Sequence, residues 1–180
     1  NYDHFVLTMT GGKQLVFVDP RQFGRILFWQ GPGVPPWWEK IPPAILSDEF
    51  TVGVVGAFLR RRARTSIKAV LLMQERFPGI GNWMADEVLW RAGFHPEAKA
   101  GAFGPLSVRK LYRTLREVCA DAMQVIGKDW GDPPASWLFN HRWKDGGSCP
   151  RTKEPLHRAE VGGRTTCWSP ARQRLGAERR

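Results

Sequence analysis

The chain has 180 residues, 42% of them hydrophobic, which is enough for one medium domain or two small ones. Its 27 Lys and Arg against 17 Asp and Glu give a formal net charge of +10 and a pI of about 10.2. This balance indicates a polyanionic partner, with nucleic acid ahead of an acidic membrane surface, although a generically basic surface would give the same numbers. The sequence shows no signal peptide and no apolar run long enough to cross a bilayer.

Three cysteines, Cys119, Cys149 and Cys167, are too few for a disulfide framework and indicate a reducing compartment. We therefore expect an intracellular protein, in the cytoplasm with the nucleoid of a bacterium or in the nucleus of a eukaryote. Because the chain opens at Asn1 within an apparent strand, we expect the later part of a longer protein, or a shortened form of one.

The first third of the chain reads as β-structure followed by a linker. Residues 4–10 and 13–18 flank a Gly-Gly pair, which is a hairpin signal, and 25–29 predict a third strand. Three strands seldom form an independent domain, so we expect the end of a larger sheet. Five prolines and two glycines in 30–43 predict a linker.

Helical periodicity dominates the middle of the chain. We predict helices over 48–62, 66–76, 82–92 and 105–126, the first capped by Ser47 and the third ended by Gly93. Near the end, 156–161 and 164–168 predict a second hairpin around Gly162 and Gly163. The fold class is therefore α+β.

The most informative stretch is the glycine turn of residues 78–82, which opens the third predicted helix. The backbone N–H groups and the positive dipole end of a helix start suit a phosphate. The arginines just before this turn, and residues 141–180 with ten Lys or Arg against four Asp or Glu, form two basic regions in the sequence. In a chain this basic, we expect the phosphate to belong to nucleic acid.

Segments 67–74, 78–82, 85–87 and 91–96 together resemble the helix–two-turn–helix domain of formamidopyrimidine-DNA glycosylase and endonuclease VIII. The resemblance extends in the family's order from 19–24 to 149–151 and 162–165, and so covers nearly the whole chain. It implies domains at 1–43 (end of the β-sandwich, with linker), 44–140 (helix–two-turn–helix) and 141–180 (a finger-like hairpin with a basic tail).

The resemblance also implies roles for individual residues. Asn82 and the Gly81 backbone should bind a phosphate beside a flipped-out nucleotide, Lys68 should reach the same region, and Arg164 should bind the phosphates from the other side. From the residues alone, Asn82 could be only an N-cap, Lys68 a solvated helix lysine, and Arg164 an ordinary charge beside a turn.

Arg21 and Phe23 match the family's loop that fills the space left by the extruded base, where a ring can wedge into the stack. Gln22 stands where the family has a second basic residue. Phe23 could instead pack in the sheet. Asp86 and Glu87 are adjacent on a helix and do not share a face, so we expect structural roles for them. For His95 we expect a capping role.

The family closes its second hairpin with four zinc-binding cysteines, and here the resemblance departs. Cys149 matches the first ligand position, whereas Thr152, Ser169 and Arg172 occupy the others, and these are not zinc ligands. We expect no cofactor and a zincless finger in which hairpin hydrogen bonds and Trp168 replace the metal. A three-ligand site of Cys149, His157 and Cys167, or a Cys149–Cys167 disulfide, remains an alternative. Cys119 should lie in the core.

The family's nucleophile is an N-terminal proline, which attacks the sugar C1′ and forms a Schiff base. None of the fourteen prolines here is terminal, so no catalytic residue is expected in this chain. The resemblance implies a monomeric, bifunctional glycosylase and abasic-site lyase of base-excision repair acting on double-stranded DNA with an oxidised base or abasic site, and no membrane partner. A non-catalytic module for damaged or abasic DNA and, less favoured, a structured-RNA-binding protein are the alternatives.

The family's variable lesion-capping loop would fall within 127–147. The residues there that could stack on a base, or simply pack, are Trp130, Trp137, Phe139 and Trp143.

Overall fold

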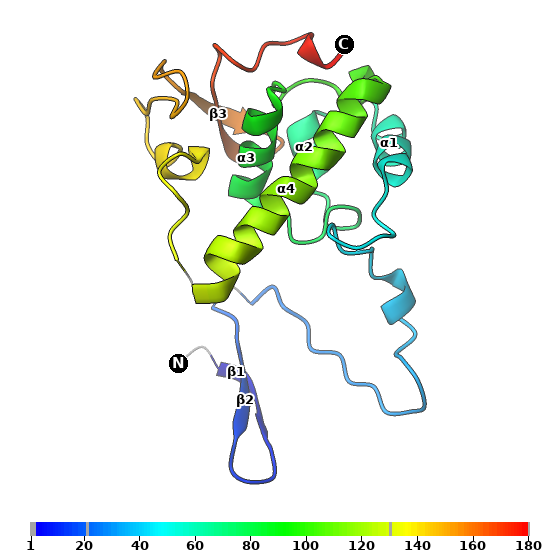
Figure 1. The fold of residues 1–180 in the computed structure, drawn as a ribbon. Helices are drawn as coiled ribbons and strands as arrows, with labels where there is room; N and C mark the ends of the chain where they lie inside the picture. Colours follow the sequence, from blue (N-terminus) through cyan, green and yellow to red (C-terminus); the bar gives the residue numbers. More distant parts are fainter. Residues whose placement is uncertain (1–2, 21, 130, 180) are drawn as a thin grey trace. The chain divides into compact units, whose positions relative to one another are not determined.

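The computed structural model describes residues 3–20, 22–129 and 131–179 (Figure 1). The chain divides into two compact units, Asn1–Lys40 and Ile41–Arg180. The described residues form four α-helices and two separate two-stranded sheets, so the fold class is α+β as predicted. The second unit contains both the helices and the finger hairpin, which the sequence had assigned to separate domains at 44–140 and 141–180.

The first unit contains the predicted hairpin. Strands β1 (Asp3–Thr8) and β2 (Gln14–Val18) pair antiparallel, from Thr8 opposite Gln14 to Asp3 opposite Val18, with an irregularity near Phe5. The Gly-Gly turn has φ values of 90° and 79°, which glycine adopts without steric cost. A short 3-10 helix, η1 (Trp38–Lys40), ends the unit inside the segment predicted as linker.

The third predicted strand is wrong. Residues 25–29 are all described and form no strand, and Phe28 is 83% exposed. The apolar run has the composition of a strand, but a strand also needs a hydrogen-bonded neighbour, and β1 and β2 pair only with each other among the described residues.

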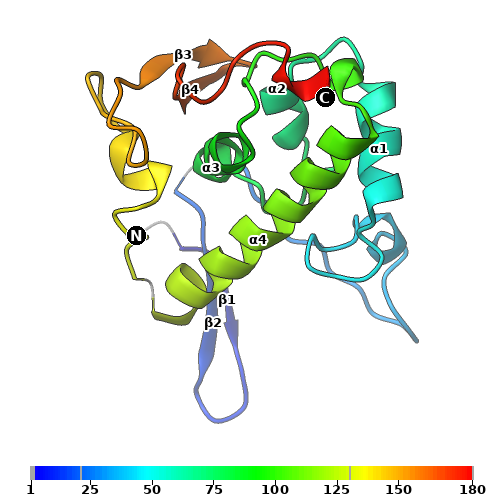
Figure 2. The same ribbon diagram turned by 45° about the horizontal axis from the view of Figure 1, so that its top comes forward.

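The second unit is built on helices α1 (Val52–Arg61), α2 (Ile67–Leu71), α3 (Asn82–Ala92) and α4 (Pro105–Asp129). The long helix α4 runs diagonally across the unit and packs against α3 and α1 (Figures 1 and 2). The main core lies between them and includes Phe50, Phe58, Ile67, Leu71, Phe77, Ile80, Leu89, Leu111 and Leu115. No helix among the described residues is long and apolar enough to span a membrane.

Helix α1 begins later than predicted because another side chain takes the carbonyl groups of the preceding segment. The Arg116 guanidinium donates to the carbonyl oxygens of Ile45, Leu46 and Ser47 at 2.9, 3.0 and 2.8 Å. Thr51 is the N-cap instead of Ser47, and its Oγ1 accepts a hydrogen bond from the Val54 N–H at 3.3 Å.

Helix α2 is shorter than predicted because Gln74 bonds to the turn that follows it. Its side-chain oxygen accepts from the Gly79 N–H, and its Nε2 donates to the Ile80 carbonyl, both at 2.9 Å. Gln74 thereby fixes the glycine turn that leads into α3.

The second hairpin forms as predicted and packs on the helices. Strand β3 (His157–Val161) pairs antiparallel with β4 (Arg164–Trp168) around Gly162 and Gly163. A Cβ placed on Gly162 would lie 2.7 Å from the Cβ of Ala69 in α2. The turn therefore approaches α2 as closely as a glycine allows.

We predict that Gly162→Ala destabilises the protein more than Gly163→Ala. Both glycines have positive φ, 64° and 75°, so both changes strain the backbone, but a Cβ on Gly163 meets nothing within 4 Å. The added clash with Ala69 should cost about 1–3 kcal/mol beyond that strain. Urea unfolding of the two variants measures the difference, and equal losses would contradict the close packing of the turn on α2.

Candidate functional site

The glycine turn brings Asn82 to the first turn of α3. Gly79 has φ 81°, and Gly81 is the N-cap of the helix, with no side-chain capping bond. Asn82 is therefore the first residue of the helix and not its N-cap. A Cβ on Gly81 would meet nothing within 4 Å, so the backbone there is open to a ligand.

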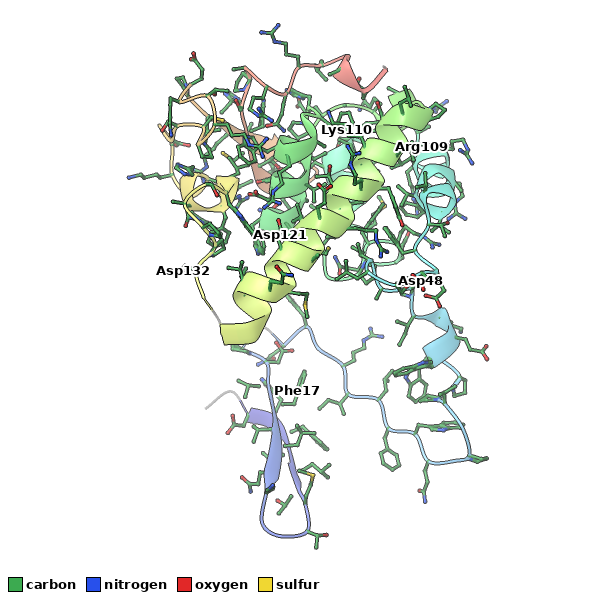
Figure 3. The ribbon with its side chains drawn as sticks, viewed as in Figure 1. Phe17, Asp48, Arg109, Lys110, Asp121 and Asp132 are labelled. Atoms are coloured by element: carbon green, nitrogen blue, oxygen red, sulfur yellow. The ribbon has the colours of Figure 1, made fainter. Side chains whose placement is uncertain are left out.

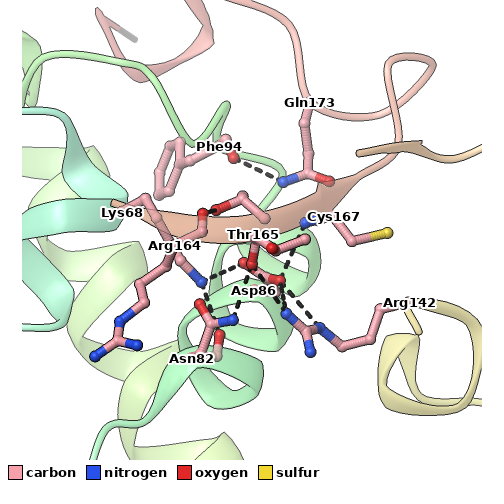
Figure 4. A network of polar contacts seen from close by, with 10 residues as sticks. Lys68, Asn82, Asp86, Phe94, Arg142, Arg164, Thr165, Cys167 and Gln173 are labelled. Atoms are coloured by element: carbon pink, nitrogen blue, oxygen red, sulfur yellow. Dashed lines mark hydrogen bonds and ion pairs between the residues drawn. The ribbon is translucent and has the colours of Figure 1, made fainter. Parts of the chain in front are cut away.

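The side chain of Asn82 joins α3 to the finger hairpin. Its Nδ2 donates to the carbonyl of Thr165 in β4 at 2.8 Å. Arg164, the preceding residue, is exposed and extends beside Asn82 (Figure 4). Gly81, Asn82 and Arg164, from segments about eighty residues apart, therefore lie together; we call them the Asn82–Arg164 site.

A buried ionic cluster lies directly beneath this site. Both carboxylate oxygens of Asp86 are used: Oδ1 accepts from Lys68, and Oδ2 accepts from Arg142 Nε and Nη2 at 3.0 and 2.6 Å. Oδ2 also accepts the backbone N–H of Cys167 at 3.1 Å. Lys68, Asp86, Arg142 and this N–H form the Asp86 cluster, which links α2, α3, the loop before the finger, and β4 (Figure 4).

Lys68 is not a solvated helix lysine, and it does not lie at the surface. It is fully buried, and its Nζ donates to the carbonyl of Asn82 at 2.7 Å as well as to Asp86. Burial lowers the pKa of this lysine, and the neighbouring Asp86 opposes that shift. Lys68 reaches the predicted region, but it does so from beneath the turn, where it holds the backbone of Asn82.

Glu87 is structural, as predicted. Burial raises the pKa of its carboxyl, while the Arg91 guanidinium beside it opposes the shift. Arg91 Nε donates to Glu87 at 2.9 Å, and its Nη1 donates to Asp121 of α4 at 2.5 Å; Asp121 is labelled in Figure 3. The other Glu87 oxygen accepts from the Phe139 N–H at 3.3 Å, which anchors the loop before the finger.

That loop packs its aromatic side chains against the start of α3. The Trp83 ring lies 6.4 Å from Trp137 and 5.2 Å from Phe139, and Phe139 lies 5.0 Å from Trp143. Trp137 is buried, whereas Trp143 is 56% exposed; Trp130 lies outside the described residues. The sequence analysis did not include Trp83 among the aromatic residues of this region, although Trp83 directly follows Asn82.

In the first unit, Asp19 shapes the turn that presents Phe23. Its Oδ2 accepts the Gly24 N–H at 2.6 Å. Phe23 is 79% exposed among the residues that the structure describes. Arg21 lies outside the described residues.

The finger positions that hold zinc in the family do not fit a metal here. Cys149 Sγ accepts a hydrogen bond from Trp90 Nε1 at 3.4 Å, and the Arg172 and Arg151 guanidinium groups lie over the Trp90 ring, 5.4 and 4.8 Å from its centre. Near the Ser169 position, Gln173 is buried, accepts the Ser169 N–H, and donates to the Phe94 carbonyl at 2.8 Å. The Arg172 guanidinium, a cation stacked on Trp90, occupies the sequence position of the family's fourth zinc ligand.

The alternatives for the cysteines are not present among the residues that the structure describes. These residues contain no group of three or more His, Cys, Asp or Glu placed to hold a metal, and all three cysteines are free. His157 instead packs its ring against Trp168, with the ring centres 4.5 Å apart. His95 accepts the Glu97 N–H on Nδ1 at 3.2 Å, a local structural role as predicted.

Comparison with known proteins assigns the chain to a family. Residues 41–130 match the formamidopyrimidine-DNA glycosylase H2TH domain. The chain belongs to the formamidopyrimidine-DNA glycosylase family. It is 33% identical over 180 residues to the enzyme of Chloroflexus aggregans, covering 96% of this chain and 65% of that one. It is also 33% identical over 175 residues to the enzyme of Arabidopsis thaliana, covering 97% of this chain and 44% of that one.

Solved structures of the family have the same fold. The MutM (Fpg) protein of Thermus thermophilus matches with a TM-score of 0.74 at 31% identity, covering 92% of this chain and 66% of that one. Lactococcus lactis Fpg in complex with DNA containing an abasic site matches with a TM-score of 0.77 at 27% identity, covering 96% and 66%. The chain thus spans less than two thirds of the length of these family members.

We predict that Asp86→Asn strongly destabilises the second unit. The change leaves Lys68 and Arg142 buried without a compensating charge, which should cost about 3–5 kcal/mol. Asp121→Asn is the matched control, because Asp121 is 44% exposed and its ion pair with Arg91 should contribute about 1 kcal/mol or less. Urea unfolding of both variants is the measurement, and a loss of under about 1 kcal/mol for Asp86→Asn would show that its charge does not hold the cluster.

Proposed function

We propose that this chain is the DNA-binding part of a bifunctional DNA glycosylase and abasic-site lyase of base-excision repair. The observation that carries the proposal is the hydrogen bond from Asn82 to Thr165, which sets the helix start beside the exposed Arg164. Related proteins support the choice of ligand: one solved structure is MutM with DNA containing carbocyclic 8-oxo-G, and another is Fpg with abasic DNA.

In this proposal the Asn82–Arg164 site binds the phosphates beside an extruded nucleotide. The Gly81 backbone and the start of α3 offer N–H groups and the positive end of the helix dipole. Arg164 supplies a planar guanidinium that can bind two phosphate oxygens. Holding the backbone from both elements offsets the few kcal/mol that extruding a base costs.

The positive charge beneath the site favours the same ligand. The Asp86 cluster contains two cations and one carboxylate, so it carries one excess positive charge. A buried charge is screened less than an exposed one, and its field extends to the turn above it.

Phe23 and Arg21 are proposed to fill the space that the extruded base leaves. The exposed ring of Phe23 is suited to wedging between base pairs, and Arg21 to bonding with the unpaired base. The covalent step is assigned to the family's N-terminal proline, which no residue of this sequence matches, so the chain contributes recognition and not the nucleophile. We propose that the protein acts inside the cell as a monomer.

We predict that Asn82→Ala and Arg164→Ala each weaken binding to an abasic duplex by about 1–3 kcal/mol, the scale of a lost charge-assisted contact. Fluorescence anisotropy at several salt concentrations measures this, and Arg164→Ala should also make the salt dependence shallower. Arg113→Ala, which removes an exposed arginine of α4, is the control. Unchanged affinity in a folded variant, or tighter binding of structured RNA than of the duplex, would contradict the proposal.

The finger is proposed to hold its shape without zinc. Its support is the stack of Arg151 and Arg172 on Trp90, together with the buried Gln173. We predict that EDTA leaves the melting temperature unchanged, because no folding energy comes from a metal. One equivalent of zinc bound tightly by protein refolded without metal would contradict this prediction.

A further inference from the structure

Helix α1 ends in a group of exposed arginines that the structure enlarges. Arg60 and Arg61 form the last turn of the helix, and Arg62 is its C-cap. Arg76, which comes from the loop after α2, lines one open hollow beside α1 together with Arg60 and Arg61. We call Arg60, Arg61, Arg62 and Arg76 the α1 arginine cluster.

The cluster is arranged around one buried aromatic ring. Arg61, Arg62 and Arg76 lie 5.4, 5.6 and 5.7 Å from the centre of the Phe58 ring, and Phe58 itself is buried. Contact with an aromatic face restrains a guanidinium and leaves its N–H edge available for an acceptor. Positive charge is therefore concentrated at one place on the surface.

Most of this charge is not neutralised by acidic side chains. Among the residues that the structure describes, the cluster makes one ion pair, between Arg62 and Glu75 at 2.7 Å, and both of these side chains are exposed. An exposed ion pair contributes little free energy, so a stronger anion can replace it. Four cations thus stand against one carboxylate, and the surface is suited to a polyanion.

The loop between α2 and α3 connects the cluster to the glycine turn. The Phe58 ring meets the Phe77 ring edge-on, with their centres 5.8 Å apart, and Phe77 directly precedes Pro78. Arg62 pairs with Glu75 of the same loop. The arginines that precede the glycine turn in the sequence therefore also contact, in space, the loop that leads into it.

The cluster lies within a few base pairs of the Asn82–Arg164 site on the scale of a DNA duplex. Arg76 is six residues before Asn82, so even an extended chain would place their Cα atoms at most about 20 Å apart. Gln74 folds this segment back by bonding to the Gly79 N–H and the Ile80 carbonyl, so the separation is shorter. Because a duplex rises about 3.4 Å per base pair, this limit corresponds to about six base pairs.

We propose that the α1 arginine cluster binds backbone phosphates of the duplex that flanks the lesion, on one side of the extruded nucleotide. The inference rests on the function proposed above for the Asn82–Arg164 site and extends the footprint of that site. The guanidinium edges match phosphate oxygens. DNA is favoured over a separate acidic protein because the cluster is fixed to the loop that forms the proposed DNA site.

This assignment separates two contributions to binding. Phosphate contacts position a duplex but carry no information about its bases. The cluster should therefore strengthen the binding of damaged and undamaged duplexes alike, whereas preference for the lesion should depend on Asn82 and Arg164.

The combined change of Arg60→Gln and Arg61→Gln tests the proposal, because both side chains are exposed and have no ion pair in the described part of the chain. Fluorescence anisotropy should show affinity falling by about tenfold, and by the same factor, for an abasic and an undamaged duplex of equal length. The slope of log K against log salt should become shallower by about 1–2. Arg113→Gln removes an exposed arginine of α4 and should alter affinity by about twofold at most.

Shortened duplexes test where the cluster binds. Two abasic duplexes are compared, one with about twelve base pairs on the first side of the lesion and about two on the second, and one with these lengths exchanged, so that each lacks the flank within about six base pairs on one side. One of them should bind the unmodified chain about tenfold more weakly than the other. The combined change should have no further effect on that weaker duplex, because the phosphates that it lacks are those bound by the cluster.

Three results would overturn the inference: unchanged affinity and salt slope after the combined change, an equal loss from Arg113→Gln, or equal effects of the combined change on both shortened duplexes. In these cases Asn82→Ala and Arg164→Ala would still weaken binding of the abasic duplex, and the proposed function would stand. If those two variants bind the abasic duplex normally, the proposed function fails and the inference fails with it.

Discussion

The buried carboxylate of Asp86 is the constraint on which the rest of the site depends. It accepts hydrogen bonds from α2 through Lys68, from the loop before the finger through Arg142, and from β4 through the Cys167 N–H. Desolvating three charges is unfavourable unless they are paired and hydrogen-bonded, so these segments are held in the arrangement in which both cations bond to the one carboxylate. That arrangement sets the start of α3 beside the hairpin.

The relation between Lys68 and Asn82 shows how this constraint reaches the surface. Lys68 uses one hydrogen bond for Asp86 and another for the Asn82 carbonyl, so the turn is tied to the ionic cluster below it. The Asn82 side chain in turn bonds to Thr165, whose carbonyl also accepts from Arg142 at 3.4 Å. Side chains held in this way need little reordering when a ligand binds, which is the advantage of preorganisation.

Side-chain contacts around Trp90 hold the turns of the finger. Trp90 on α3 fills the small core beneath the hairpin, together with Leu138, Cys149 and Cys167. Two arginines stack on its ring, and Gln173 connects the last turn to the Phe94 carbonyl. Cation–π stacking and one buried amide thus contribute to holding these turns in place.

Local patterns in the sequence were sufficient to predict α3, its end at Gly93, the glycine turn and the second hairpin. Short-range periodicity and turn chemistry specify these features. The family resemblance rested on these segments together with 19–24, 67–74 and 149–151. Local patterns failed at residues 25–29, which lack a pairing partner, and at Ser47, whose carbonyl is taken by Arg116. Tertiary structure alone decided the burial of Lys68, the place of Trp90 in the core beneath the finger hairpin, and the role of Arg142. Each depends on contacts or positions that only the folded chain defines, and neither burial nor ion pairing between distant segments is encoded in the spacing of neighbouring residues.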